Sequence, residues 1–160
     1  MTPRSAVVCL AVLFLSGCGT REEEVRRIVR EEFARATQRK IVSPVQTIGP
    51  YSPAVRIGNF LFVSGQIGID QETGDLRNES IEVEARQALD NINRILIAEG
   101  YDSSDVVSAT VYLRDMKDYT RMNLIYGGYF QDGNYPARTT VGVTTLPKDA
   151  NIEITVVAYK

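Results

Sequence analysis

The chain has 160 residues, of which 44% are hydrophobic and 24% charged, and a formal net charge of −2, as expected for one globular domain. It has no histidine, and both cysteines lie in the first eighteen residues, which excludes a Ser-His-Asp or Cys-His mechanism and a typical zinc site from the rest of the chain. Residues 41–160 hold ten Lys and Arg against fifteen Asp and Glu, a net charge of −5 that argues against nucleic acid as a partner.

The first twenty residues, MTPRSAVVCLAVLFLSGCGT, have the pattern of an export signal over 1–17. Their apolar run, Ala6–Leu15, is shorter than the ~20 residues of a transmembrane helix. The LSGC at 15–18 resembles the bacterial lipoprotein box, which implies cleavage before Cys18 and lipid attachment to its sulfur. The alternative is a simple cleaved signal with an incidental cysteine. Gly19 after the cysteine favours the periplasmic face of the outer membrane.

Residues 18–40 are predicted to combine the lipidated Cys18 with a charged helical tether. Twelve of the twenty residues 21–40 are charged, and Glu22 and Arg26 form one of several favourable pairs four residues apart. The apolar residues Val25, Ile28, Val29, Phe33 and Ala36 recur at helical spacing. A coiled coil is the alternative, although Glu32 interrupts its apolar seam.

Two strands and a helix come next. Short apolar runs at 54–57 and 60–63 flank Gly58-Asn59 and predict a hairpin. DQETGD at 70–75 predicts a turn. A helix ending at Gly100 follows from the spacing of six apolar residues, namely Ala85, Ala88, Leu89, Ile92, Ile95 and Leu96.

The remaining elements complete one sheet. VVSATVYL at 106–113 predicts a strand, and residues 118–130 predict a helix in spite of Gly127 and Gly128. Strands follow at 138–145 and 151–159, joined by a turn at LPKD. The order β-β-α-β-α-β-β predicts an α+β fold with one mixed sheet and two helices on one face. No P-loop or GxGxxG fingerprint is present, so no cofactor and no metal are implied.

The final strand predicts an oligomer. Ile152, Ile154, Val156 and Ala158 lie on one face, while the other face, with Val157 and Tyr159, is still half apolar. A sheet with helices on one side and a half-apolar surface on the other needs a second cover, and partner subunits are the expected one.

Arg138, in YPARTTVG, and Glu153, between two isoleucines, are charged residues in apolar strands. Arg138 can grip a carboxylate with its planar guanidinium, or it can form a cross-strand salt bridge with Glu153. A hairpin closed by LPKD would place Arg138 opposite Val157 and Glu153 opposite Gly142, too far apart for that bridge. Glu153 is then either turned to solvent or set in a pocket, where it can position a water or move a proton.

Four more residues have both a structural and a functional interpretation. Tyr51 sits between two prolines in IGPYSPAV, either packed in the loop or presented to a ligand. Ser64-Gly65 interrupts a strand, either as a bulge or as a point where a ligand approaches the backbone. Asn123 is either an ordinary polar residue of its helix or a ligand contact.

Taken together, the motifs IGPYSPAV, FVSGQIGID, TGDL, NYPARTTVGV and LPKDANIEITVVA resemble those of the reactive intermediate deaminase (Rid, or YjgF) family over residues 41–160. The resemblance implies a chorismate-mutase-like fold and a homotrimer with clefts between subunits.

In the deaminase branch the arginine of the PAR motif binds the substrate carboxylate, which implies that role for Arg138. The carboxylate fifteen residues later, Glu153, positions the attacking water, and Tyr51 completes the catalytic set. The resemblance further implies substrate contacts for Ser64, Gly65, Asn123 and Thr140. Thr140 replaces a frequent cysteine at a position that contributes mainly backbone contacts.

The implied reaction is hydrolysis of reactive 2-imino acids, or their enamine tautomers, to 2-keto acids and ammonia. One alternative is a non-catalytic, envelope-tethered trimeric module that binds small carboxylates. Such a module would need Arg138 but has less need of Glu153. Another is a related hydrolase that acts on a different C–N bond. Export is the main departure from the family, because members of this branch usually act in the cytoplasm.

Overall fold

The computed structural model describes residues 19–130 and 133–160, which fall into two compact units that meet between Gln38 and Arg39. The first unit is helix α1 (Gly19–Ala36), four residues shorter at its C-terminal end than the predicted tether. The expected Glu22–Arg26 pair is present at 2.7 Å. Within the described residues, no helix combines the length and apolar character needed to cross a membrane. Cys18 and the signal segment 1–17 lie outside the described residues.

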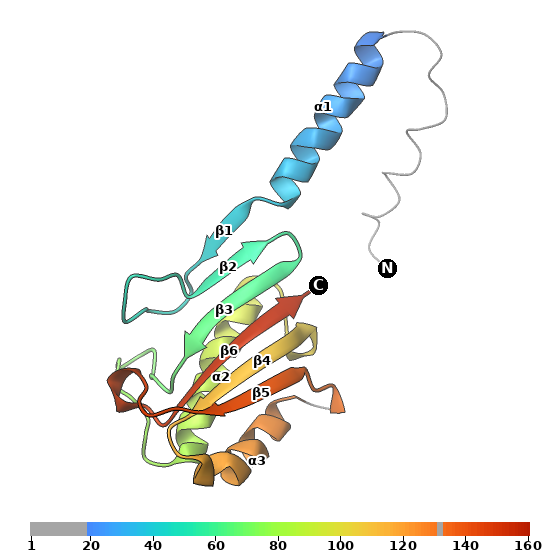
Figure 1. Ribbon diagram of the computed structural model, residues 1–160. Coiled ribbons are helices and arrows are strands. Elements are labelled where there is room, and N and C mark those ends of the chain that lie inside the picture. Colours follow the sequence, from blue (N-terminus) through green and yellow to red (C-terminus); the bar gives the residue numbers. More distant parts are fainter. Residues whose placement is uncertain (1–18, 131–132) are drawn as a thin grey trace. The chain divides into compact units, whose positions relative to one another are not determined.

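The second unit is a six-stranded mixed sheet with two helices, drawn in Figure 1. Its strands have the order β1-β2-β3-β6-β4-β5 across the sheet. In chain order the elements are β1 (Arg39–Val42), β2 (Ala54–Ile57), β3 (Phe60–Gln66), α2 (Ile81–Ala98), β4 (Val106–Leu113), α3 (Tyr119–Tyr129), β5 (Ala137–Gly142) and β6 (Ile152–Tyr159).

The sheet is built from one hairpin and two strand–helix–strand crossovers. β2 and β3 form the predicted hairpin, whose turn residue Gly58 has a φ of 59° that glycine adopts without steric cost. β4, α3 and β5 form a parallel crossover, and β6 lies antiparallel between β3 and β4. Both helices cover the same face of the sheet (Figure 1), which confirms the predicted α+β class. β1 was not predicted, and it pairs with β2 at the edge.

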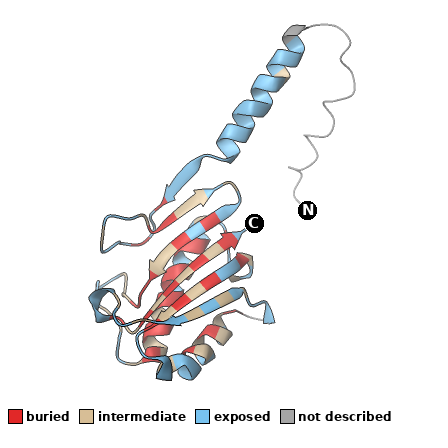
Figure 2. Ribbon diagram, in the orientation of Figure 1, coloured by how far each residue is buried: buried red, intermediate tan, exposed pale blue. Residues whose placement is uncertain are grey.

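The core lies between that covered face and the helices. Along β6 the residues Ile152, Ile154, Val156 and Ala158 are buried and alternate with half-buried ones (Figure 2), as their spacing predicted. Helix α2 begins where the Ser80 side chain accepts a hydrogen bond from the main-chain N–H of Val83. Its apolar stripe, including the fully buried Ile92, packs on the sheet.

The pairing of β5 differs from the prediction. The LPKD hairpin would have placed Arg138 opposite Val157, but β5 does not pair with β6 at all. Arg138 instead aligns with Ala109 on β4, and Glu153 aligns with Tyr112 on the same strand. A strand–helix–strand segment favours this parallel arrangement, because the helix supplies the long return that parallel strands require.

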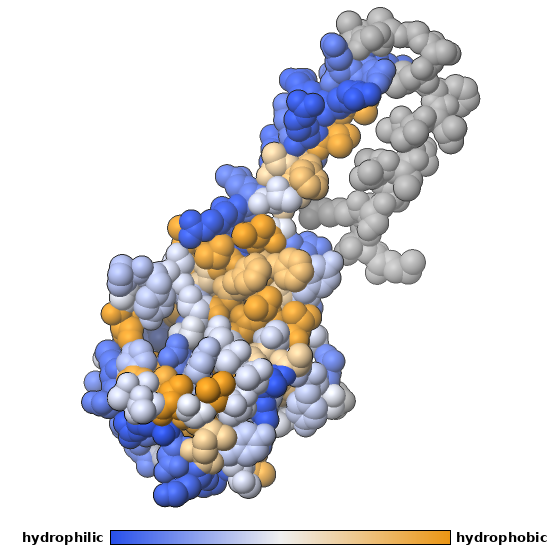
Figure 3. Space-filling model, viewed as in Figure 1, coloured by the Kyte–Doolittle hydropathy of each residue, from blue (hydrophilic) through white to orange (hydrophobic). Residues whose placement is uncertain are grey.

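The face of the sheet away from α2 and α3, here called the open face, carries exposed apolar side chains. Phe60 and Tyr159 pack with their ring centroids 4.9 Å apart, and Phe62 beside them is 45% exposed. Figure 3 shows this apolar surface over β2, β3 and β6. An apolar surface of this kind is typical of a face that another protein surface covers.

Candidate functional site

Arg138 lies on β5, at the edge of the sheet, with its side chain directed toward α3. Its guanidinium carbon is 4.5 Å from the centre of the Tyr126 ring and 5.8 Å from that of Tyr119. Nη2 donates a hydrogen bond of 3.3 Å to the Tyr119 hydroxyl. Within residues 19–130 and 133–160, Arg138 forms no ion pair with a carboxylate. The cation is therefore held by aromatic rings, and its charge is available to an anion.

A cavity of about 400 Å³ lies beside this guanidinium. It is lined by Arg138, three residues of α3 and two of the loop before β5, namely Asn123, Tyr126, Gly127, Tyr135 and Pro136. Two polar atoms in its wall, Asn123 Oδ1 and the Tyr126 hydroxyl, are buried without a hydrogen-bond partner among the described residues. Buried polar atoms are normally paired, so the wall is one that a polar ligand or water would complete.

The two tyrosines next to Arg138 have opposite electrostatic environments. Burial raises the pKa of Tyr126 to about 12, against a smaller lowering by the Arg138 charge. Tyr119, at the protein surface, has a lowered pKa because the Asn123 amide and Arg138 favour its phenolate. At neutral pH Tyr126 is consequently a neutral hydroxyl, able to donate a hydrogen bond to an anion.

Glu153 lies on the open face, half-buried in the middle of the sheet. Burial raises its pKa above the usual range of a glutamate, because water is removed from the charged form. Its carboxylate lies directly over Gly65, where a β-carbon would overlap it. Ser64 and Gly65 together stand opposite Thr155 in a bulge of β3, which confirms the bulge interpretation; the approach of a ligand to this backbone stays a prediction.

Tyr51 and Ser64 belong to the same region as Glu153. Tyr51, 45% exposed, lines a small hollow together with Gly65, Gln66 and other residues. The Ser64 hydroxyl donates a 2.7 Å hydrogen bond to the Ser52 carbonyl, which ties the Tyr51 loop to β3. Ser64 therefore fixes the position of this loop.

The predicted site residues form two groups on opposite faces of the sheet. Arg138 aligns with the buried Ala109 on the helix side, whereas Glu153 aligns with Tyr112 on the open face, three residues along β4. Thr140 lies on the helix side with Arg138. Within one chain, the guanidinium and the carboxylate consequently do not point toward the same space, and the direct salt bridge considered from the sequence is not formed.

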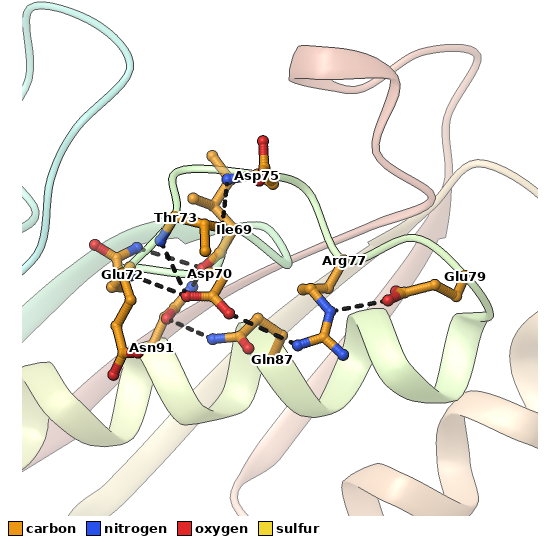
Figure 4. A network of polar contacts seen from close by, with 10 residues as sticks. Ile69, Asp70, Glu72, Thr73, Asp75, Arg77, Glu79, Gln87 and Asn91 are labelled. Carbon is orange, nitrogen blue, oxygen red and sulfur yellow. Dashed lines mark hydrogen bonds and ion pairs between the residues drawn. The ribbon is translucent and has the colours of Figure 1, made fainter.

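A polar network fixes the loop that follows the bulge (Figure 4). One oxygen of Asp70 accepts the main-chain N–H of Glu72 at 2.8 Å, and this bond holds the pKa of Asp70 below its usual value. Arg77 lies between Asp70, at 3.6 Å, and Glu79, at 2.9 Å. Asn91 of α2 donates from Nδ2 to two carbonyls of the loop, at 3.1 and 2.8 Å. The Asn91 bonds hold the start of this loop, at Ile67 and Ile69, against α2.

Three residues that position Arg138 or Glu153 were not predicted from the sequence. Glu84, completely buried in α2, accepts hydrogen bonds from the main-chain and side-chain nitrogens of Asn151, each at 2.8 Å. This pair holds the chain two residues before Glu153. For Tyr119 the sequence predicted only a place in the helix over residues 118–130. Glu84 could have been found from the sequence, because it is a glutamate on the apolar side of a helix. The contact of Tyr119 with Arg138 could not, because it depends on where β5 lies.

Comparison with known proteins gives concordant results. A family profile described as Endoribonuclease L-PSP matches residues 41–160. A RutC family protein from Pyrococcus horikoshii is 51% identical over 113 residues, which are 71% of this chain and 89% of that protein. A human protein named 2-iminobutanoate/2-iminopropanoate deaminase is 43% identical over 125 residues, covering 76% of this chain and 90% of that protein. The crystal structure of Escherichia coli TdcF with bound serine has a TM-score of 0.72 and 33% identity, over 76% of this chain and 98% of that one.

Proposed function

The chain belongs to the Endoribonuclease L-PSP family, the Rid family of the sequence resemblance, and shares its chorismate-mutase-like fold; on that premise we propose that it hydrolyses small 2-imino acids to 2-keto acids and ammonia. The observation that carries the proposal is the Arg138 guanidinium, which no carboxylate of the described residues neutralises and which borders a 400 Å³ cavity with unsatisfied polar atoms. A cavity with a few convergent polar groups is the usual form of a small-molecule site.

Arg138 binds the substrate carboxylate in this mechanism. Its fork of N–H groups matches the two oxygens of a carboxylate, and the Tyr126 ring keeps the fork in place. The Tyr126 hydroxyl and Asn123 are near enough to complete the polar wall. Holding the acid end fixes the C=N carbon relative to the attacking water, and such positioning lowers the barrier of a two-component reaction.

Glu153 directs the water. A 2-imino acid protonated on nitrogen is already electrophilic, so the water needs only orientation and removal of one proton as its oxygen bonds to the imine carbon. The resulting carbinolamine takes that proton back on nitrogen; its C–N bond then breaks and its hydroxyl gives up its proton, which releases ammonia as ammonium and leaves the 2-keto acid. A carboxylate with a raised pKa is suited to accepting and returning that proton.

The separation of Arg138 and Glu153 across the sheet has a structural consequence for this mechanism. A site that uses both residues must combine Arg138 of one subunit with Glu153 of another. The apolar open face, with Phe60, Phe62 and Tyr159, supports an association of subunits through the same surface that carries Glu153. We therefore propose the homotrimer that the family resemblance implies, with its sites at subunit boundaries.

Two other functions are less well supported. The family description names an endoribonuclease, but residues 41–160 have a net charge of −5, which is unfavourable for binding RNA phosphates, and they lack histidine, the commonest general acid or base. A module that only binds carboxylates would account for Arg138. It would not account for a half-buried Glu153 held over Gly65, and the human relative bears the name of a deaminase.

The proposed location is the cell envelope, with the protein anchored through a lipid on Cys18 and spaced from the membrane by α1. The support is the LSGC sequence at residues 15–18 and the charged helix that follows it. Incorporation of radiolabelled palmitate is expected for the wild type and should be lost in Cys18→Ser; equal labelling of both would refute the anchor.

Imine hydrolysis is tested by coupling the purified protein to an amino-acid oxidase that produces the imine from 2-aminobutanoate. Remaining imine is trapped with semicarbazide and measured. The wild type should shorten the imine lifetime, Arg138→Ala and Glu153→Ala should not, and Arg30→Ala, at an exposed residue of helix α1, should match the wild type. A wild type that leaves the imine lifetime unchanged would rule out the reaction.

Subunit complementation tests where the site is formed. Arg138→Ala and Glu153→Ala, each inactive alone, are mixed, unfolded and refolded together. If each site takes one residue from each of two subunits, mixed trimers contain some intact sites and activity returns. Mixtures that stay inactive although mass spectrometry shows mixed trimers would place both residues in the site of one subunit.

A further inference from the structure

We infer that this chain is adapted to 2-imino acids with longer apolar side chains, of four or more carbons, and that Gly127 sets this preference; the inference rests on the proposed function. Gly127 is on α3, one residue after Tyr126, and lines the cavity beside Arg138. With the carboxylate on Arg138, the substrate side chain extends along the wall formed by Gly127, Tyr135 and Pro136.

A glycine within α3 has no conformational reason to be there. Gly127 lies in the last turn of α3, but its φ is not in the left-handed region that favours glycine at helix ends, and a helical glycine costs up to about 1 kcal/mol relative to alanine. Nor does internal packing require it. A β-carbon at position 127 would meet only the Tyr135 hydroxyl, at an ordinary contact distance of 3.7 Å. What the missing side chain leaves is space in the cavity.

The size and lining of the cavity indicate what fills this space. In one subunit it measures about 400 Å³, within the roughly 300–1,000 Å³ of small-molecule pockets, before a second subunit adds Glu153. The lining includes the Tyr135 ring, Pro136 and Gly127, and within the described lining Arg138 is the only charged residue. An apolar chain gains from leaving water for such a wall, whereas a charged one would lose hydration without a partner.

Gly128 provides a matched control. It is the next residue on the same helix and has no atom within 4 Å of its β-carbon position. It lines a different hollow, between α2 and α3, on the outer side of the helix. Substitution at either glycine alters helix propensity equally, but only substitution at Gly127 fills the cavity beside Arg138.

The experiment compares wild type, Gly127→Leu and Gly128→Leu, with Gly127→Ala as a milder variant, on imines generated from alanine, 2-aminobutanoate, norvaline and norleucine. Binding of the corresponding 2-keto acids is measured by calorimetry, so the preference is tested even if turnover is absent. For the wild type, affinity and kcat/KM should rise up to roughly fourfold per added methylene. Gly127→Leu should abolish that rise and leave the alanine-derived compound within twofold, while Gly128→Leu should behave as wild type.

Two outcomes would overturn the inference. One is a wild type that binds the longer keto acids no better than pyruvate, which would mean that the side chain does not use this wall. The other is a Gly127→Leu variant that weakens every ligand equally and dissociates the oligomer, which would make the cavity wall a subunit contact. A wild type that binds the series with the expected gradient but does not hydrolyse imines would refute the proposed reaction and retain the preference.

Discussion

The carboxylate of Glu153 lies so close over Gly65 that a β-carbon at position 65 would stand 2.6 Å from its Cδ atom. Because Gly65 has no side chain, the bulged strand β3 leaves room for the carboxylate of Glu153 on the neighbouring strand β6. A substitution at Gly65 can therefore displace this carboxylate while Glu153 itself is kept.

Gly65→Ala should reduce kcat by roughly tenfold to a hundredfold, because the new methyl group displaces the carboxylate and small displacements of reacting groups have effects of this size. Stability should change little, since the overlapping atoms belong to the end of a side chain. Gly68→Ala is the contrasting variant: its β-carbon would meet the Glu84 main-chain oxygen at 2.9 Å, so a lower melting temperature is expected. Unchanged kcat in Gly65→Ala, measured with the oxidase-coupled assay, would contradict the prediction.

Glu153→Gln should become increasingly more stable than the wild type as the pH rises. Burial raises the folded-state pKa of Glu153, so its favourable contribution is complete below the unfolded-state pKa, near 4.5, and is lost as the pH rises through the folded value. The glutamine does not titrate. Thermal unfolding of both proteins in a pH series from below 4.5 to neutrality gives the difference in stability between the variant and the wild type. If the stability advantage of the variant shrinks with rising pH, the carboxylate is better solvated than its surroundings indicate.

The buried pair of Glu84 and Asn151 should show strong coupling in a double-mutant cycle. Glu84→Gln turns an amide donor toward the Asn151 amide, and Asn151→Asp brings two carboxylates together, so each change should cost about 1–3 kcal/mol or more. The double variant restores one donor and one acceptor and should recover much of the loss. Denaturant unfolding measures the four stabilities. Additive losses would mean that the two side chains do not depend on each other.

Tyr119→Phe should raise KM by roughly threefold to tenfold and leave kcat nearly unchanged. The ring stays, but Arg138 loses the hydroxyl that holds Nη2, and a hydrogen bond to a charged group contributes up to about 1.5–3 kcal/mol, less at 3.3 Å. Tyr101→Phe is the control, because Tyr101 also lies under a guanidinium, that of Arg56, and its hydroxyl donates to the Asn59 carbonyl. Steady-state kinetics decide the matter: a fall in kcat at constant KM would assign the hydroxyl to the chemical step.

Local patterns in the sequence predicted much of the fold. Alternation along 152–159 identified the buried face of β6, and the apolar spacing of α2 identified its core side, because each pattern reflects the repeat of its own element. The hairpin at Gly58 followed from turn chemistry. The motifs around Arg138 and Glu153 pointed to the same residues that the structure places beside a cavity and over a bulge.

Strand pairing was the part that local patterns predicted wrongly. Residues 138–145 and 151–159 are close in sequence and suggested a hairpin, but β5 returns through α3 to lie parallel to β4. The helix between them was itself a signal for a parallel crossover. β1 was missed because only four residues form it and three of them are exposed.

The sequence by itself determined most of the strands, both helices of the sheet and most of the core, and which charges are out of place in an apolar strand, because these properties depend on neighbours one to four positions away. Only the tertiary structure decided that Arg138 and Glu153 face opposite sides of the sheet, that Tyr119 and Tyr126 hold the guanidinium, and that Gly127 opens a cavity. The physical reason is that strand order and register follow from how the helices pack on the sheet, and a shift in pairing moves every side chain relative to its neighbours.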